Sequence, residues 1–476
     1  MSLAKGAPRL AKIVPRAKSK FQRRKIKHME KNLTSGSVLK NIVFFSLPFL
    51  LAYFLQTLYG LADLFIIGQF DTVASITAVS IGSQVMHMLT VMIVGLTMGS
   101  TVSIAQAVGA NNKKQVSHTI GNTAVLFVAV SVIVTAVLVF FVDPIVGAMS
   151  TPPESVPGTA AYLFVCFLGI PFITAYNVIS AIYRGLGDSQ SPMYFVAVAC
   201  VINIILDYIF IGALHLGPIG AALGTTLSQA VSVLFALIMF MRKRHILPDR
   251  EDFTISRSIM SKLIKIGLPI SLQDGFVQIA FITITIIANR RGLNDAAAVG
   301  IVEKIIGFLF LVPSSLLSSV STLCAQNMGA CKPERAVLTL RYAIYMAASF
   351  GLLVSLMAQF NGDGVVNLFT SDPTVITRGG EYLRGYIWDC LFAGIHFCFS
   401  GYFCACGHAG LSFMHNIITL FLARIPGVYI MSAMYPHTLY PMGLATAAGS
   451  LVSVIICLIT FAWLQRQTKN NLCSAI

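Results

Sequence analysis

The hexapeptide Ala-Gln-Ala-Val-Gly-Ala at residues 105–110 returns in the second half of the chain as Ala-Gln-Asn-Met-Gly-Ala at residues 325–330. A second pair keeps nearly the same offset, because Ser-Leu-Pro at residues 46–48 matches Gly-Leu-Pro at residues 267–269. Matches in the same order over most of the chain indicate an internal duplication rather than chance agreement of common residues.

The composition is that of a membrane protein. Of the 476 residues, 56% are hydrophobic and 11% are charged, and the mean hydropathy is +0.80. Soluble domains carry about 25% charged residues. Twelve apolar segments are long enough to cross a bilayer as helices: 41–69, 74–108, 118–142, 158–184, 190–213, 217–241, 261–290, 295–327, 335–360, 378–406, 409–434 and 439–465. The sequence therefore predicts an all-α polytopic membrane protein with twelve transmembrane helices.

The positive charges predict the orientation of these helices. Of the 33 Lys and Arg residues, 27 fall in the two termini or in loops on one side, and four fall on the other side. Because cytoplasmic loops carry an excess of Lys and Arg, we expect both termini in the cytoplasm and the chain in the plasma membrane. Twelve of these charges precede residue 41. They belong to a cytoplasmic extension that helps set the topology, to a contact with anionic lipid or nucleic acid, or to a transit peptide. We expect no nucleic-acid partner.

The duplication predicts five regions: a basic tail at 1–40, an amino-terminal lobe at 41–241, a cytoplasmic linker at 242–260, a carboxy-terminal lobe at 261–465 and a short tail at 466–476. Six spans per half is an even number, so both halves enter the membrane in the same orientation. Such parallel repeats are related by a pseudo-twofold axis along the membrane normal, as in transporters whose halves rock around a central site. Two six-helix bundles around a central cleft are expected.

Two carboxylates in the first half are candidate functional groups. Asp63 lies toward the outer end of the first span and Asp207 toward that of the fifth, with Asn203 on the same helix face as Asp207. An ionised carboxylate within a span costs on the order of 2.5–3.5 kcal/mol. Two neighbouring carboxylates cannot both ionise at low cost, so a proton or a sodium ion is the expected occupant, with Asn203 as a further oxygen ligand. Alternatively, each Asp caps its helix end or contacts interfacial water.

The second half carries other ionisable residues within spans. Asp389 contacts a cationic substrate or is hydrogen-bonded in packing, and Arg424 is a possible partner for it. His396 is either an interior histidine or a proton relay. Glu303 and Lys304 neutralise each other or reach a water-filled cavity. The candidate substrate-binding residues are Gln56, Tyr59, Gln278, Asp389 and His396.

No Walker A sequence, metal-binding run or Ser-His-Asp arrangement occurs in the chain. An ion gradient is therefore the expected source of energy. We expect neither a cofactor nor enzymatic activity.

The residues resemble the multidrug and toxic compound extrusion (MATE) family across about 41–465. The most specific matches are Gln-Thr-Leu-Tyr-Gly-Leu-Ala-Asp at 56–63, the two Ala-Gln-Xaa-Xaa-Gly-Ala motifs, Tyr-Arg-Gly-Leu-Gly-Asp-Ser at 183–189, and Asn203 with Asp207. The resemblance implies a V-shaped pair of lobes. It also implies export of cationic or amphipathic small molecules in exchange for H⁺ or Na⁺. We expect the protein to be a monomer.

The resemblance also implies site residues. The cation site of DinF-like members matches Asp63, Asn203, Asp207 and Thr225. NorM-like members also use carboxylates in helices 7 and 10, where this chain has Val277 and Ala393. We therefore expect one coupling site, for H⁺ or Na⁺, in the amino-terminal lobe.

Three alternative functions remain open from the sequence: a lipid-linked saccharide flippase of the same superfamily, a polytopic membrane enzyme, and a gradient-driven importer of another fold. A flippase would line its cleft with several cations, whereas the spans contain only Lys304 and Arg424.

Overall fold

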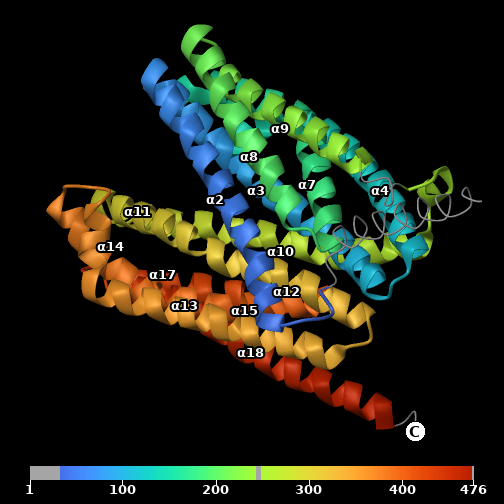
Figure 1. Cartoon of the computed structure of the whole chain (residues 1–476). Coiled ribbons are helices and arrows are strands. Elements are labelled where there is room, and N and C mark those ends of the chain that lie inside the picture. Colours follow the sequence, from blue (N-terminus) through green and yellow to red (C-terminus); the bar gives the residue numbers. More distant parts are fainter. Residues whose placement is uncertain (1–32, 243–247, 474–476) are drawn as a thin grey trace, which may run out of the picture.

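A computed structural model describes residues 33–242 and 248–473, with no β-strand among them (Figure 1). Residues 1–32 of the predicted basic tail lie outside the described residues. Residues 243–247 of the linker and residues 474–476 also lie outside them. The helices of the first half are α2 (Val38–Phe70), α3 (Val73–Gly109), α4 (Lys113–Phe140), α5 (Val142–Ala148), η1 (Pro153–Ser155), α6 (Val156–Leu168), α7 (Ile170–Gly185), α8 (Gln190–Asp207), η2 (Tyr208–Ala213) and α9 (Gly217–Arg242).

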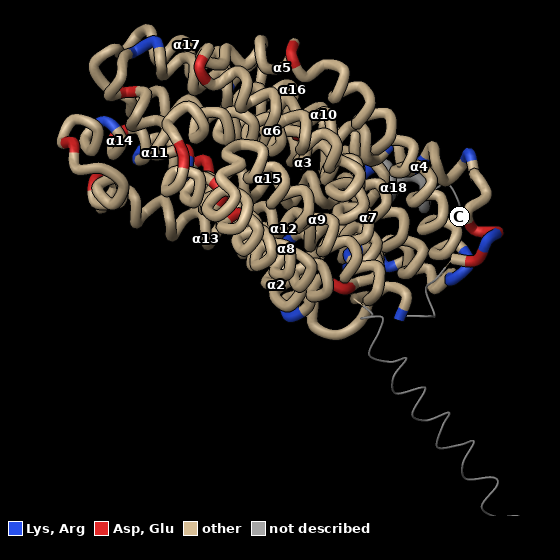
Figure 2. The backbone as a smooth tube through the Cα atoms, turned by 90° about the horizontal axis from the view of Figure 1, so that it is seen from above, with Lys and Arg blue, Asp and Glu red and all other residues tan. Residues whose placement is uncertain are grey.

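The second half repeats this pattern. Its helices are α10 (Arg257–Asn289), α11 (Leu293–Leu309), α12 (Leu311–Gly329), α13 (Pro333–Asn367), α14 (Pro373–Tyr386), α15 (Trp388–Ala405), α16 (Ala409–Thr419), η4 (Leu420–Arg424), α17 (Ile425–Met434) and α18 (Tyr440–Cys473). A short helix between the halves, η3 (Arg250–Phe253), lies in the predicted linker. Figure 2 shows the charged residues gathered toward the ends of the molecule, with long uncharged stretches between them.

Eleven helices in the described part of the chain are long and apolar enough to cross a membrane. A twelfth span forms if α6 and α7 are counted together, because they pass the same test as a pair bent by 48°. The bend falls at Gly169, two residues before Pro171, whose nitrogen has no hydrogen to donate to the preceding turn. The predicted all-α, twelve-span fold is confirmed.

The two halves form two lobes that diverge toward one end of the molecule and meet at the other (Figure 1). Helices α2–α9, blue to green, form one lobe, and α10–α18, yellow to red, form the other. The loop between α2 and α3 and the loop between α10 and α11 lie at the diverging end. The loops that follow α3 and α12 lie at the end where the lobes meet, which we call the closed end.

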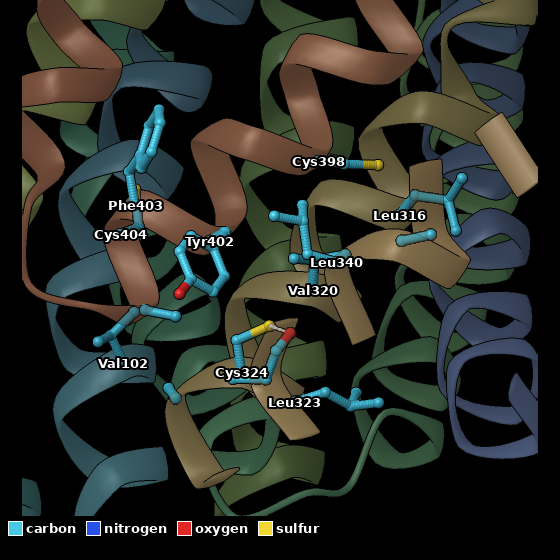
Figure 3. Packing of buried hydrophobic residues seen from close by; sticks show 14 of the residues in the cluster. Val102, Leu316, Val320, Leu323, Cys324, Leu340, Cys398, Tyr402, Phe403 and Cys404 are labelled. Atoms are coloured by element: carbon cyan, nitrogen blue, oxygen red, sulfur yellow. Dashed lines mark hydrogen bonds between the residues drawn. The ribbon is translucent and has the colours of Figure 1, made fainter. Parts of the chain in front are cut away.

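The lobes are joined near the closed end by close helix packing. Helix α3 lies against α10, where a Cβ atom on Gly99 would be 2.2 Å from the carbonyl oxygen of Leu263, and one on Gly267 would be 2.2 Å from that of Leu96. Only glycine permits this backbone approach. The adjoining hydrophobic core includes Val102 of α3, Val320 and Leu323 of α12, and Phe403 of α15 (Figure 3). The closed end is therefore a packed core that both lobes share.

Candidate functional site

Three helices of the first lobe bring the four predicted coupling residues together. Asp63 comes from α2, Asn203 and Asp207 from α8, and Thr225 from α9. The Thr225 hydroxyl donates a hydrogen bond of 3.2 Å to Oδ2 of Asp63. The Asp63 carboxyl also lies next to the side chains of Asp207 and Asn203. Residues from three separate parts of the first half therefore line one small site.

The local structure of α8 and α9 explains how Asp207 enters this site. Asn203 and Asp207 are four residues apart on α8 and therefore share one face. After Asp207 the backbone continues as a π-helical turn, Tyr208–Ala213, a geometry that is frequent at functional sites. On α9, a Cβ atom at Gly224 would lie 2.0 Å from Oδ1 of Asp207. Glycine at this position therefore provides the space for the carboxylate.

The site is removed from solvent, and most of its polar atoms, the amide nitrogen of Asn203 included, have no hydrogen-bond partner among the described residues. Asp63, Asn203 and Asp207 are 4%, 1% and 0% exposed. Within the described part of the chain, Oδ1 of Asp63, Oδ1 of Asn203 and both carboxylate oxygens of Asp207 have no hydrogen-bond partner. Burial at this level means that neither Asp contacts interfacial water. Two buried carboxylates with unsatisfied oxygens require a proton or a cation between them, because unpaired buried charge is costly.

The described residues contain no cluster of three or more His, Cys, Asp or Glu side chains that could hold a metal ion. The site instead offers carboxylate, amide and hydroxyl oxygens, which are the ligands that hard cations prefer. Its two acidic groups match a proton or a monovalent cation better than a resident transition metal.

The candidate substrate-binding residues are spread over both lobes. Gln56 and Tyr59 are half-buried on α2, with Tyr59 one turn before Asp63 and on the same face. Gln278 is half-buried on α10 of the other lobe. Asp389 and His396 are both buried on α15. Only Gln56 and Tyr59 therefore share a helix with the Asp63 site.

Asp389 is paired within the chain. Arg424 donates a hydrogen bond of 3.2 Å to Oδ2 of Asp389, and one of 2.8 Å to the hydroxyl of Tyr386. The guanidinium carbon of Arg424 also lies 5.3 Å from the ring centre of Phe281 and 5.7 Å from that of Tyr386, as in cation–π contacts. The pairing that the sequence left as a possibility is therefore present, and it supplies Asp389 with a positive charge.

Removing Arg424 is expected to destabilise the protein. Loss of one partner leaves the other as a buried, uncompensated charge, which costs about 3–5 kcal/mol. Arg424→Ala should therefore lower the thermal unfolding temperature of the purified protein markedly. The double variant Asp389→Asn with Arg424→Ala should recover part of the loss, and Lys304→Ala, which removes an exposed cation from another span, should have little effect. Equal unfolding temperatures for Arg424→Ala and Lys304→Ala would contradict the expectation.

The remaining second-half candidates have separate environments. Glu303 accepts a hydrogen bond of 3.2 Å from Thr285, while the neighbouring Lys304 is exposed. His396 is buried with its ring 5.7 Å from that of His415. His415 itself lies between the hydroxyls of Ser400 and Ser453, at 3.0 and 2.7 Å. No sequence pattern points to His415, because its partners come from other helices.

Comparison with known proteins agrees with this geometry. The MatE family model matches the chain twice, at residues 48–209 and 269–430. The chain belongs to the MatE family. The two matches begin at Pro48 and Pro269, the prolines of the two Leu-Pro copies, so the family model itself repeats in the chain, as the sequence duplication predicts. Asp63 and Asp207 both fall within the first match.

The chain is similar to bacterial proteins over most of its length. It is 27% identical over 406 residues to "Probable multidrug resistance protein YpnP" of Bacillus subtilis, which covers 84% of this chain and 90% of that protein. It is also 27% identical over 406 residues to "Multidrug export protein MepA" of Staphylococcus haemolyticus, covering 85% and 89%.

Solved structures share the fold. A MATE crystal structure in complex with MaL6 superposes with a TM-score of 0.84 at 24% identity, covering 92% of this chain and 98% of that one. An outward-facing multidrug resistance MATE family transporter of the MOP superfamily gives a TM-score of 0.83 at 24% identity, covering 92% and 97%. This MatE-family chain therefore has the architecture of a MATE transporter.

Proposed function

We propose that this MatE-family protein is a secondary active multidrug efflux antiporter, which exports cationic or amphipathic small molecules in exchange for H⁺ or Na⁺ by alternating access. The observation that carries the proposal is the buried group of Asp63, Asn203, Asp207 and Thr225, in which four oxygens lack donors. A transported ion would bind these oxygens in one conformation of the transport cycle and dissociate from them in the other. The names of the relatives support multidrug compounds as the exported substrates.

Helix α2 provides a physical route from this site to the other lobe. Asp63 lies on α2, and ten residues earlier on the same helix Tyr53 shares a hydrogen bond of 2.9 Å with Ser318 of α12. Ten residues of α-helix span about 15 Å. Binding of an ion at Asp63 and Asp207 therefore acts on a helix that touches both lobes. We infer that this binding changes the packing of α2 and lowers the affinity of the protein for its exported substrate.

The distribution of Lys and Arg supports an orientation with the closed end in the cytoplasm. The loops after α3 and α12 are basic and lie at this end. In this orientation the structure is open toward the outside, both termini are cytoplasmic, and the protein lies in the plasma membrane. We infer that it works as a monomer, since each chain has both lobes, and that it acts by transport rather than catalysis.

Imposed ion gradients test the coupling. The purified protein is reconstituted in vesicles, and transport of a fluorescent organic cation is measured with a pH gradient alone and then with a sodium gradient alone. One gradient should drive transport in the direction opposite to ion flow, and Asp63→Asn should abolish that response. A transport rate that is the same with and without each gradient would exclude antiport and would favour the alternative functions.

A further inference from the structure

The two copies of the Ala-Gln-Xaa-Xaa-Gly-Ala motif meet at the closed end. A Cβ atom on Gly109 of α3 would lie 2.0 Å from the carbonyl oxygen of Gln326, and one on Gly329 of α12 would lie 2.0 Å from that of Gln106. The contacts are therefore reciprocal: the glycine of each motif rests on the glutamine of the other. These two glycines let the ends of α3 and α12 touch through their backbones.

The glutamine side chains then cross between the lobes. Gln106 donates a hydrogen bond of 2.8 Å to the carbonyl oxygen of Ala405, the last residue of α15. Gln326 donates one of 3.2 Å to the carbonyl oxygen of Gly185, the last residue of α7. The last carbonyls of a helix have no intrahelical partner, so each amide satisfies an otherwise free acceptor. The two acceptors are separated along the chain by the same offset as the two donors, so the bonds are related by the duplication.

The side-chain oxygens of the same glutamines also accept hydrogen bonds. Oε1 of Gln106 accepts from Nζ of Lys262 on α10 at 2.6 Å. Oε1 of Gln326 accepts from the backbone nitrogen of Leu33, just before α2, at 3.4 Å. Each amide therefore makes two bonds; three of the four connect one lobe to the other, and the fourth ties the segment before α2 to α12.

We propose that Gln106 and Gln326 are positioning residues that form a twofold latch, which holds the lobes together at the closed end while the other end is open. Because three of these bonds join different lobes, any motion that separates these ends breaks all three. The bonds of Gln106 and the bonds of Gln326 are related by the repeat axis. Rotation of one lobe against the other about their junction therefore stretches both sets of bonds together. The latch therefore favours the conformation described here over one that opens at this end. This inference rests on the proposed alternating access.

Distance measurements between paired spin labels test the latch without requiring transport. Labels are placed at Lys114→Cys and Glu334→Cys, two exposed positions that follow α3 and α12. Cys331, which is exposed, Cys406, which is half-buried, and Cys473 near the carboxy terminus are changed to Ser in every sample. The full-length protein is studied in lipid nanodiscs. The test variants are Gln106→Leu, Gln326→Leu and the double variant. Where a leucine variant is not produced, asparagine, which keeps a shorter amide, is placed at the same position instead.

Asn327→Leu is the matched control, because its amide is buried in the same helix but donates to Leu323 of its own helix. Each single Gln variant should raise the population with separated labels by about threefold to tenfold, as expected for loss of one or two buried hydrogen bonds. The double variant should raise it further, and the control should match the parent protein.

Unchanged label distances in the double variant would overturn the latch, and so would an equal shift in Asn327→Leu. The outcome is separable from that of the gradient experiment. If the labels separate in the Gln variants but neither ion gradient drives transport, the proposed role of Gln106 and Gln326 is supported and only the antiport proposal is refuted.

Discussion

Replacing Asp63 or Asp207 by asparagine is expected to lower ion-driven export by about a hundredfold, near the upper end of coupling free energies of about 1–3 kcal/mol. Asparagine has nearly the same shape as aspartate, but it carries no charge and does not take up a proton at neutral pH. The four buried oxygens without donors would then lose the charge that attracts the coupling ion. The site would keep its volume and lose its function.

The measurement is gradient-driven uptake of a fluorescent cation by vesicles containing each variant, at matched protein content. Asp143→Asn is the control, because Asp143 is an exposed carboxylate of the same lobe on the short helix α5. Its transport should equal that of the parent protein. Each variant should also reach the membrane at normal levels, since loss of a buried charge removes a desolvation cost. Full export by Asp63→Asn or Asp207→Asn would refute the assignment of the site.

Gly224→Ala is expected to reduce export by about tenfold or more, although the substitution adds only a methyl group. That methyl would lie 2.0 Å from Oδ1 of Asp207, so the carboxylate or α9 must move. Alanine is a better helix former than glycine by about 1 kcal/mol, so α9 itself would not be weakened. A loss of transport would therefore report displacement of Asp207 from its partners.

Gly300→Ala provides the matched comparison, because a Cβ atom at Gly300 on α11 meets no other atom within 4 Å. The two variants should have similar amounts of protein in the membrane, and only Gly224→Ala should require a steeper ion gradient for half-maximal export. Equal transport by the two alanine variants would show that Asp207 does not need its present position.

Much of the scaffold can be predicted from the sequence because its signals are local or repetitive. Apolar segments about as long as the bilayer is thick predict spans one at a time, and the nearly constant offset between repeated motifs predicts two similar halves. The pairing of Asn203 with Asp207 on one helix face also follows from their spacing of four. None of these inferences requires knowledge of which helices are neighbours.

The composition of the candidate site follows from the sequence with help from the family resemblance, whereas its geometry does not. Nothing in the residues near Gly224 distinguishes it from other glycines in apolar helices until Asp207 is placed against it. The ion pair of Asp389 with Arg424 depends likewise on where the fold places η4 relative to α15. No sequence pattern indicates the role of Gln106 and Gln326, although the motif that contains them is the clearest repeat in the chain.

The amino-acid sequence alone predicts a chain that spans the membrane many times, has two repeating halves, and carries carboxylates in the apolar spans of its first half. Helix packing brings Asp63, Asn203, Asp207 and Thr225 into one site and places the duplicated glutamines next to each other at the closed end. Hydropathy and periodicity act along a single helix, so the sequence records them directly. A contact between helices depends on packing between residues that are far apart in the chain, and no local pattern encodes it.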